Sequence, residues 1–248
     1  MTWLFVGDAH FSPEDGERRK RFFELLDRFG GSLGALVIMG DLFDFWFGFP
    51  DGSSFISRYA DVLEALGRLR ARGIRVVYLE GNHDFHLGTL MRDEMGIEVY
   101  PASVELELDG MRVFLSHGDR IQGSLSHRVY STLLKNTLTY SVMSWLGPRR
   151  VSQLARMLGD NSRHRNLRYG KRVQKELRAF ALERLEAGTD VVILSHSHIP
   201  EAVTVEGAGG LRHYFNVGNW IQAFSYVRYE TGVGFSLEFF RRGEGEGG

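Results

Sequence analysis

The chain has 248 residues, of which 43% are hydrophobic and 25% charged, values typical of a globular protein with one sizeable core. No stretch approaches the roughly 20 consecutive apolar residues of a membrane span, and the apolar part of the N-terminus is too short for a signal peptide. The absence of cysteine excludes disulfides and thiolate metal ligands, so a metal site here must use His, Asp, Glu or Asn. We expect a cytoplasmic protein.

The formal net charge of -1 conceals an uneven distribution of charge. Residues 120–175 contain 12 Lys and Arg but a single acid, Asp160, whereas the other residues hold 18 basic and 30 acidic side chains. A solvated helical face would normally intersperse acids with bases. This basic segment therefore indicates an anionic partner, which could be a phosphate, a nucleic acid or a lipid headgroup.

The first part of the chain alternates short apolar runs with amphipathic stretches. Residues 3–6, 35–39 and 74–79 are apolar runs that lead into glycine and polar residues, a pattern typical of buried strands that run into loops. Residues 18–29 and 57–72 have the apolar spacing of helices and stop at glycines. The alternation predicts an α/β core with at least partly parallel strands.

A different pattern follows residue 100. Residues 104–108 alternate between apolar and acidic side chains, and the turn pair Asp109-Gly110 separates them from a second strand over 111–116, which predicts a β-hairpin. Residues 190–194 predict one more buried strand, and strands and turns are expected from there to about residue 240.

Between the hairpin and that last buried strand, the sequence predicts helices. We expect helical structure over 124–172 with breaks at Gly159 and Gly170, followed by a helix over 173–187. No internal repeat or linker is present, so we predict a single domain over residues 1–242 with a helical insertion at about 124–172. The Gly/Glu-rich residues 243–248 are expected to form a flexible tail.

Five polar clusters share one position in the pattern, because each comes directly after an apolar strand-like run. They are Asp8-Ala9-His10, Gly40-Asp41, Gly81-Asn82-His83-Asp84, His117-Gly118-Asp119 and His196-Ser197-His198. In open α/β sheets, ligands bind where the loops after the carboxyl ends of several strands meet. Carboxylate, amide oxygen and imidazole without sulfur are suitable ligands for hard or borderline divalent metals. The two oxygens of one carboxylate, most plausibly that of Asp41, could bridge two ions about 3.5–4 Å apart.

Taken together, these five clusters resemble the calcineurin-like metallophosphoesterase superfamily over residues 7–198, with Ser195 where the last motif usually has glycine. The resemblance implies a four-layer α/β/β/α sandwich with a helical lid insertion and two divalent metal ions, usually Mn²⁺. It implies one ion held by Asp8, His10, Asp41 and His198, and a second held by Asp41, Asn82, His117 and His196. It also implies that His83 contacts the phosphate or protonates the leaving group, that Asp84 orients His83, and that Asp119 supports His117.

The insertion suggests a narrower resemblance, because it is both basic and apolar. Together with Trp46 and the run Asn161-Ser162-Arg163 it resembles the UDP-2,3-diacylglucosamine pyrophosphatase family of lipid A synthesis. That resemblance implies a UDP-linked diacylated glucosamine substrate, with Trp46, Asn161, Ser162, Arg163 and Arg168 as substrate contacts. It also implies a peripheral location at the anionic cytoplasmic face of the inner membrane. His83 departs from this family, whose best-known members have Arg there.

Other functions compete with this interpretation. A phosphodiesterase that acts on nucleotides or nucleic acid would suit the basic segment, but nucleases of this kind usually carry large extra domains, which are absent here. The apolar residues of the insertion could also simply pack it on the core. A non-catalytic scaffold would not need the complete set of seven ligands together with His83, and a membrane-binding module would not need any of them. The sequence sets no oligomeric state.

Overall fold

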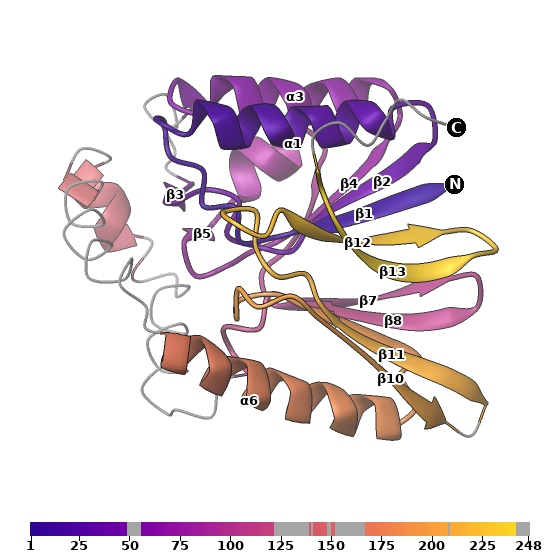
Figure 1. Cartoon of the computed structure of the whole chain (residues 1–248). Helices are drawn as coiled ribbons and strands as arrows, with labels where there is room; N and C mark the ends of the chain where they lie inside the picture. The colour runs from indigo at the N-terminus through magenta and orange to yellow at the C-terminus, as the bar shows by residue number, and fades with distance from the viewer. Residues whose placement is uncertain are drawn as a thin grey trace.

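The computed structural model describes residues 1–48, 56–121, 139, 141–147, 150–151, 167–207 and 209–241, without the side chains of Thr89, Leu167 and Arg168. Most of the predicted insertion at 124–172 therefore lies outside the described residues. Two sheets pack face to face, with helices on both outer surfaces (Figure 1). This arrangement confirms the predicted four-layer α/β/β/α sandwich.

The first sheet has six strands in the order β13-β12-β1-β2-β4-β6. Strands β1, β2, β4 and β6 are mutually parallel, whereas β12 is antiparallel to β1 and β13 is antiparallel to β12. Their bounds are β1 (Thr2–Val6), β2 (Leu33–Ile38), β4 (Arg75–Leu79), β6 (Glu98–Tyr100), β12 (Ser225–Glu230) and β13 (Gly234–Phe239).

The second sheet has five strands in the order β10-β11-β9-β8-β7. Strands β8, β9 and β11 are parallel, and the antiparallel strands β7 and β10 form the two edges. The predicted hairpin is confirmed, because β7 pairs with β8 across the turn at Asp109-Gly110. The bounds are β7 (Ser103–Leu108), β8 (Met111–Ser116), β9 (Val191–Leu194), β10 (Glu201–Gly207) and β11 (Gly210–Asn216).

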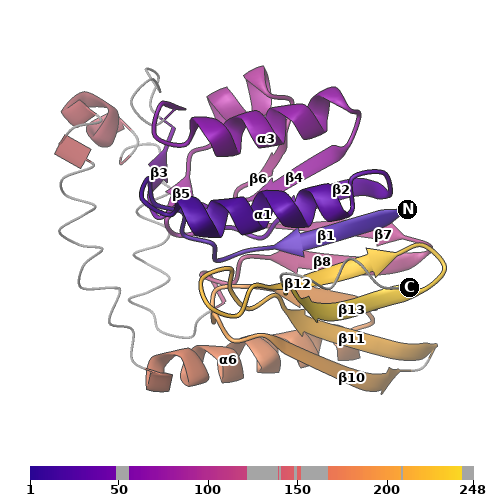
Figure 2. The same ribbon diagram turned by 45° about the horizontal axis from the view of Figure 1, so that its top comes forward.

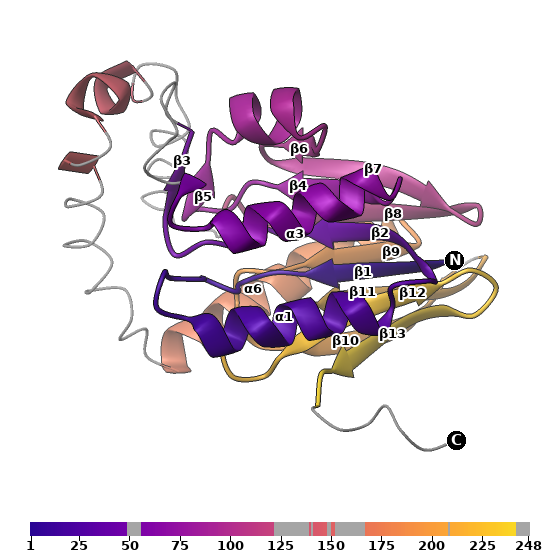
Figure 3. The same ribbon diagram turned by 90° about the horizontal axis from the view of Figure 1, so that it is seen from above.

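Helices α1 (Gly16–Arg28) and α3 (Ala60–Ala71) lie side by side on the outer face of the first sheet (Figures 1 and 3). The opposite face of the sandwich is covered by α6 (Leu167–Glu186), as Figure 2 also shows. The predicted break at Gly170 is wrong, since α6 continues through this residue where the backbone oxygen of Ser197 lies beside it. A single glycine inside a helix costs only about 1 kcal/mol relative to alanine, so it need not end the helix.

Three apolar clusters hold the layers together. One fills the space between α1, α3 and the first sheet, another lies between the two sheets, and the third lies between α6 and the second sheet. Alternation along the strands produces this division: Leu4 and Val6 face the helices, whereas Trp3 and Phe5 face the other sheet. In the part of the chain that the structure describes, no helix is long and apolar enough to cross a membrane.

Two small elements were not predicted from the sequence. A short parallel pair joins β3 (Trp46–Phe47) to β5 (Asp84–Phe85), directly beside two of the polar clusters. A π-helical segment, η1 (Gly88–Glu94), follows β5 and leads to β6. Both elements are too short to produce a periodic signal in the sequence.

Candidate metal centre

The five polar clusters meet at one end of the sandwich, because the strands before them end there in both sheets. The structure brings together two groups of side chains whose possible ligand atoms lie within 4.8 Å of one another in each group. We call Asp8, His10 and His198 the open group, and Asp41, His117 and His196 the closed group. A third combination, His10, Asp41 and His83, connects the two groups.

The open group contains ligand atoms from both sheets. Oδ1 of Asp8 lies 3.3 Å from Nε2 of His198 and 3.7 Å from Nε2 of His10, and the two imidazole nitrogens are 3.4 Å apart. The side chains of His10 and His198 remain 14% and 29% exposed, whereas Asp8 is fully buried. This group therefore borders solvent on its imidazole side.

The closed group is almost sealed from solvent. Nε2 of His117 lies 3.5 Å from Oδ2 of Asp41, 3.2 Å from Nδ1 of His196 and 3.3 Å from Oδ1 of Asn82. The three side chains that define the group are no more than 2% exposed. Asn82 therefore lies with the closed group, next to His117.

Asp41 lies between the two groups. Its Oδ2 is 3.6 Å from Nε2 of His10 and 3.5 Å from Nε2 of His117, while its Oδ1 accepts a hydrogen bond from the backbone N–H of His83 at 2.8 Å. One oxygen is thus used to fix the loop, and the other faces imidazoles from both groups. This is the position that a bridging carboxylate requires.

The donor set suits divalent cations. Oδ1 of Asp8 is buried and accepts no hydrogen bond among the described residues, although its partner oxygen Oδ2 accepts from Ser195 Oγ and the His196 N–H at 2.6 and 2.7 Å. Nδ1 of His117 donates to the backbone oxygen of Met39 at 2.8 Å, which leaves Nε2 as the ligand atom. Carboxylate oxygens and imidazole nitrogens face one another at 3.2–3.7 Å. A cation bound between them would remove the repulsion between their lone pairs.

The backbone at these loops is held in an unusual conformation. Asp8, His10, Asp41, His196 and His198 all have φ between 44° and 67°, in the left-handed region that L-residues seldom adopt. Such strain is stored where the surrounding structure over-determines it, and it clusters at functional sites. Here it turns the ligand side chains back toward the centre.

Neighbouring glycines allow the strained loops to approach one another. A Cβ on Gly81 would lie 2.0 Å from Oδ1 of Asp41, and a Cβ on Gly40 would lie 2.5 Å from Nδ1 of His117. No side chain fits at either position without displacing a candidate ligand. The Gly-Asp and Gly-Asn pairs of the sequence therefore have a steric reason.

Burial and neighbouring charges shift the pKa values of the histidines in the centre. Burial lowers the pKa of His10 to about 4 and that of His196 to about 3, the second helped by the neighbouring His117. Burial also opposes charge on His117, but the carboxylate of Asp41 outweighs it and raises the pKa of His117 to about 10. Without a metal, a proton on His117 supplies the positive charge that the two buried aspartates attract.

The structure corrects the role expected for Asp84. Its buried carboxylate accepts hydrogen bonds from the Tyr78 hydroxyl at 2.6 Å and from the backbone N–H groups of Asp41, Leu42 and Gly81 at 2.9, 2.6 and 3.0 Å. The imidazole of His83 instead pairs through Nδ1 with the backbone oxygen of Asp44 at 3.0 Å. Asp84 therefore joins the loops after β2 and β4 and does not orient the His83 ring.

The remaining predicted residues have different outcomes. Asp119 is buried and its charge favours the protonated form of His117, but Nδ1 of that ring is bonded to Met39. Trp46 is 2% exposed and packs against Phe43 and Tyr59, so its indole lies in the core. Asn161, Ser162 and Arg163 lie outside the described residues, as does the side chain of Arg168.

Two supporting residues were not predicted. Arg18 of α1 donates to the backbone oxygens of Ala9 and His10 at 2.7 and 3.3 Å. The side-chain amide of Asn219 donates to the backbone oxygen of His198 at 2.8 Å. Both clamp strained loops of the open group. Arg18 gives no sequence signal, since a helical arginine is ordinary, whereas the Gly218-Asn219-Trp220 run after β11 is an unusual polar break.

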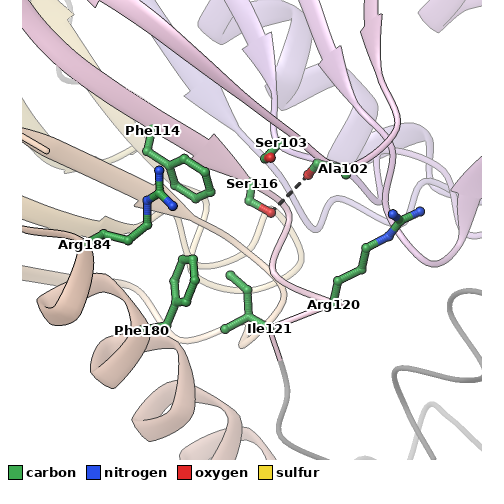
Figure 4. Close-up of a pocket in the computed structure, with 8 residues that line it drawn as sticks. All are labelled: Ala102, Ser103, Phe114, Ser116, Arg120, Ile121, Phe180 and Arg184. Atoms are coloured by element: carbon green, nitrogen blue, oxygen red, sulfur yellow. Dashed lines mark hydrogen bonds between the residues drawn. The ribbon is translucent and has the colours of Figure 1, made fainter. Parts of the chain in front are cut away.

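A groove of about 430 Å³ lies on the outer face of the second sheet, between α6 and β8 (Figure 4). Phe114, Phe180 and Ile121 form its apolar part, with Arg120 and Arg184 beside them. None of the seven predicted metal ligands lines it. The groove is therefore separate from the converging loops, although Ser116 of its wall directly precedes His117.

Comparisons with known proteins agree with this geometry. The family model described as calcineurin-like phosphoesterase matches residues 1–200. The UDP-2,3-diacylglucosamine hydrolase of Yersinia enterocolitica is 26% identical over 230 residues, which is 92% of this chain and 95% of that protein. The protein of the same name from Yersinia pestis matches with the same identity and coverage.

Solved structures are also similar. A dimetal phosphatase from Danio rerio has a TM-score of 0.45 at 11% identity, and the match covers 97% of this chain and 99% of that one. A metallophosphoesterase from Sphaerobacter thermophilus has a TM-score of 0.42 at 14% identity, and the match covers 97% of this chain and 90% of that one.

Proposed function

The chain belongs to the calcineurin-like phosphoesterase family and is a metal-dependent phosphoesterase, and from this premise we propose that it hydrolyses the pyrophosphate bond of UDP-2,3-diacylglucosamine. The products would be UMP and 2,3-diacylglucosamine 1-phosphate. The observation that carries the proposal is the similarity to UDP-2,3-diacylglucosamine hydrolases over 92% of the chain, at 26% identity. That similarity extends through the basic, apolar insertion, where a substrate with acyl chains would be recognised.

The proposed centre holds two divalent ions. Asp8, His10, Asp41 and His198 would bind one ion, and Asp41, Asn82, His117 and His196 would bind the other, with Mn²⁺ as the proposed metal. The convergence of these side chains supports the assignment, above all the placement of Asp41 Oδ2 between Nε2 of His10 and Nε2 of His117. When bound, such a pair polarises a phosphoryl group and makes hydroxide available near neutral pH.

The protein's own groups would then orient the phosphoryl group and move protons. His83 offers Nε2 to the substrate, since its Nδ1 is occupied by the backbone oxygen of Asp44. When Nε2 also carries a proton, it would donate a hydrogen bond to a phosphoryl oxygen or pass that proton to the leaving oxygen. Its ring packs edge-on against His10 with centroids 4.7 Å apart, so it borders the open group, where solvent reaches the centre. Asp84 would act indirectly, by holding the ligand loops in register.

The location proposed for this reaction is the cytoplasmic face of an anionic membrane, where such a lipid would reside. Val142 and Trp145 are 48% and 82% exposed on the described helical residues 141–147. Lys171 and Lys175 are exposed on α6. Exposed apolar side chains on one helical segment and exposed cationic side chains on another would suit attraction to anionic headgroups. Asn161, Ser162, Arg163 and Arg168 remain the proposed substrate contacts, whereas the buried Trp46 would support the loop after β2 and would not touch the substrate directly.

The test is a direct assay with Mn²⁺. The protein is incubated with UDP-2,3-diacylglucosamine, with the diester bis-p-nitrophenyl phosphate and with single-stranded DNA, and Asp41→Ala provides the inactive control. Release of UMP from the lipid at a kcat/KM well above that for the generic diester supports the proposal. Turnover of the generic diester alone would refute the lipid substrate, and cleavage of DNA would favour a nucleic-acid substrate.

A further inference from the structure

The His83 residue is held at three points by the segment that follows β2. Its backbone N–H donates to Oδ1 of Asp41 at 2.8 Å, and its backbone oxygen accepts from the N–H of Trp46 at 2.9 Å. Its ring nitrogen Nδ1 lies 3.0 Å from the backbone oxygen of Asp44. The imidazole is therefore oriented by this segment, which no local sequence pattern predicts.

The ring contact decides which nitrogen is available. A carbonyl oxygen can only accept, so Nδ1 of His83 carries a proton and Nε2 is the nitrogen left to accept and release one. A ring nitrogen of His83 lies within 4.8 Å of ligand atoms of His10 and Asp41. Any displacement of the Asp44 carbonyl would thus change both the tautomer of His83 and its distance from the centre.

Asp44 is itself fixed by a buried hydroxyl. Its Oδ1 accepts a hydrogen bond from the backbone N–H of Phe45 at 2.8 Å, and it also accepts from the hydroxyl of Tyr59. Tyr59 is 2% exposed, and its ring packs against Phe43 and Trp46 at centroid distances of 4.6 and 6.0 Å. It directly precedes α3, so the hydroxyl ties the loop after β2 to the start of that helix.

We propose that Tyr59 and Asp44 form a positioning pair that holds the imidazole of His83 in its Nδ1–H form with Nε2 toward the substrate. The inference rests on the role given to His83 in the proposed function. It does not depend on which phosphoester is the substrate. Tyr59 touches neither the ligands nor the reacting atoms, so its effect must pass through Asp44 and His83. A tyrosine that only filled the core would need its ring but not its hydroxyl.

A spectroscopic experiment tests the position of the ring without any turnover. Long-range ¹H–¹⁵N correlation spectra of the Mg²⁺-loaded protein, with His83 assigned from a His83→Gln variant, report which nitrogen carries the proton. We expect the Nδ1–H form in the wild type and a mixture of tautomers in Tyr59→Phe. Tyr226→Phe is the matched control, because Tyr226 is also buried and its hydroxyl also donates to a carboxylate, that of Glu238, at 2.7 Å.

A kinetic experiment then tests whether the hydroxyl acts through His83. With bis-p-nitrophenyl phosphate as substrate, Tyr59→Phe should lower kcat roughly ten-fold and leave KM and metal content unchanged, within the range that a misplaced catalytic group costs. Adding the substitution to His83→Ala should lower kcat no further, because the two residues act on one step. Tyr226→Phe, which loses a hydroxyl that contacts Glu238, should stay near the wild-type rate.

The outcomes separate this inference from the proposed substrate. A single Nδ1–H form of His83 in both wild type and Tyr59→Phe would overturn the positioning role, and so would effects of Tyr59→Phe and His83→Ala on kcat that multiply. A tautomer shift that is absent in Tyr226→Phe would support it even if UDP-2,3-diacylglucosamine proved not to be a substrate. Loss of metal or of folding in Tyr59→Phe alone would instead identify a purely structural residue.

Discussion

The open and closed groups of the metal centre are built from the same residue types but differ in burial. His10 and His198 of the open group are 14% and 29% exposed, whereas Asp41, His117 and His196 of the closed group are at most 2% exposed. The open group is clamped by hydrogen bonds to its loop carbonyls from Arg18 and Asn219. The closed group is held by buried hydrogen bonds, from the Asp41 N–H to Asp84, from Nδ1 of His117 to the Met39 oxygen and from the His196 N–H to Asp8. One group is therefore accessible to water and substrate, and the other serves as its rigid base.

The largest effect should come from removing Asp41, which lies between the two groups. Asp41→Ala is expected to abolish binding of both ions and to lower activity by at least about 10³-fold, since preorganised electrostatic groups contribute on this scale. Metal analysis of the purified variant, together with an assay on bis-p-nitrophenyl phosphate, checks this. Retention of even one tightly bound ion with substantial activity would contradict the bridging position of Asp41.

Replacing one histidine in each group should show which group contributes more to the stability of the fold. His117→Ala leaves Asp41 and Asn82 facing a buried void, so we expect loss of one ion and a drop of about 2–4 kcal/mol in the free energy of unfolding. His198→Ala should also lose one ion but lower that free energy by only about 1 kcal/mol, because its side chain is partly exposed. Metal content and chemical denaturation measure both. Equal destabilisation would mean that the closed group is not the more rigid one.

A pair of glycine substitutions tests the close approach of the loops. In Gly81→Ala the added Cβ meets Oδ1 of Asp41 at 2.0 Å, so stability should fall by about 1–3 kcal/mol and metal should bind more weakly. Gly67→Ala is the control, because Gly67 lies within α3 with no atom within 4 Å of the added Cβ. There alanine should stabilise the protein by about 0.5–1 kcal/mol. Thermal unfolding should therefore show a lower melting temperature for Gly81→Ala and a higher one for Gly67→Ala than for the wild type.

The smallest expected effect is a change in the number of protons that the protein releases when the metal binds. The pKa of His117 is raised to about 10 by Asp41, so its contribution to the stability of the metal-free protein is fully present below about pH 6.5 and is lost as the pH rises through about 10. Metal binding at neutral pH must displace this proton. Calorimetric titration of the metal in buffers of different ionisation enthalpy should show release of about one proton from His117.

The same titration of His117→Gln provides the comparison. It should show almost no proton release, because the pKa values of His10 and His196 are lowered to about 4 and about 3 and these rings are already neutral at that pH. Equal release by both proteins would place the displaced proton elsewhere in the centre.

Much of the fold could be predicted from local pattern. The apolar runs at 3–6, 35–39 and 74–79 correspond to β1, β2 and β4, and the hairpin at 104–116 was predicted almost to the residue. The helix at 18–29 was shifted by two residues at its start and one at its end. Such signals survive because burial on one or both faces of a strand or helix imposes a short repeat on the sequence. The two-residue strands β3 and β5 carry no repeat and were missed.

The sequence by itself determined the chemistry of the centre, because strand ends, glycines and ligand types are local features that the parallel topology must bring to one edge. Only the tertiary structure decided how each side chain is used. The carboxylate of Asp84 accepts hydrogen bonds from backbone N–H groups that lie 41 to 43 positions earlier in the chain. The ring of His83 contacts a carbonyl 39 positions earlier, and the backbone oxygen of Arg18 accepts a hydrogen bond from the indole N–H of Trp220, 202 positions later. Contacts over such separations depend on how the layers pack, and no local pattern encodes them.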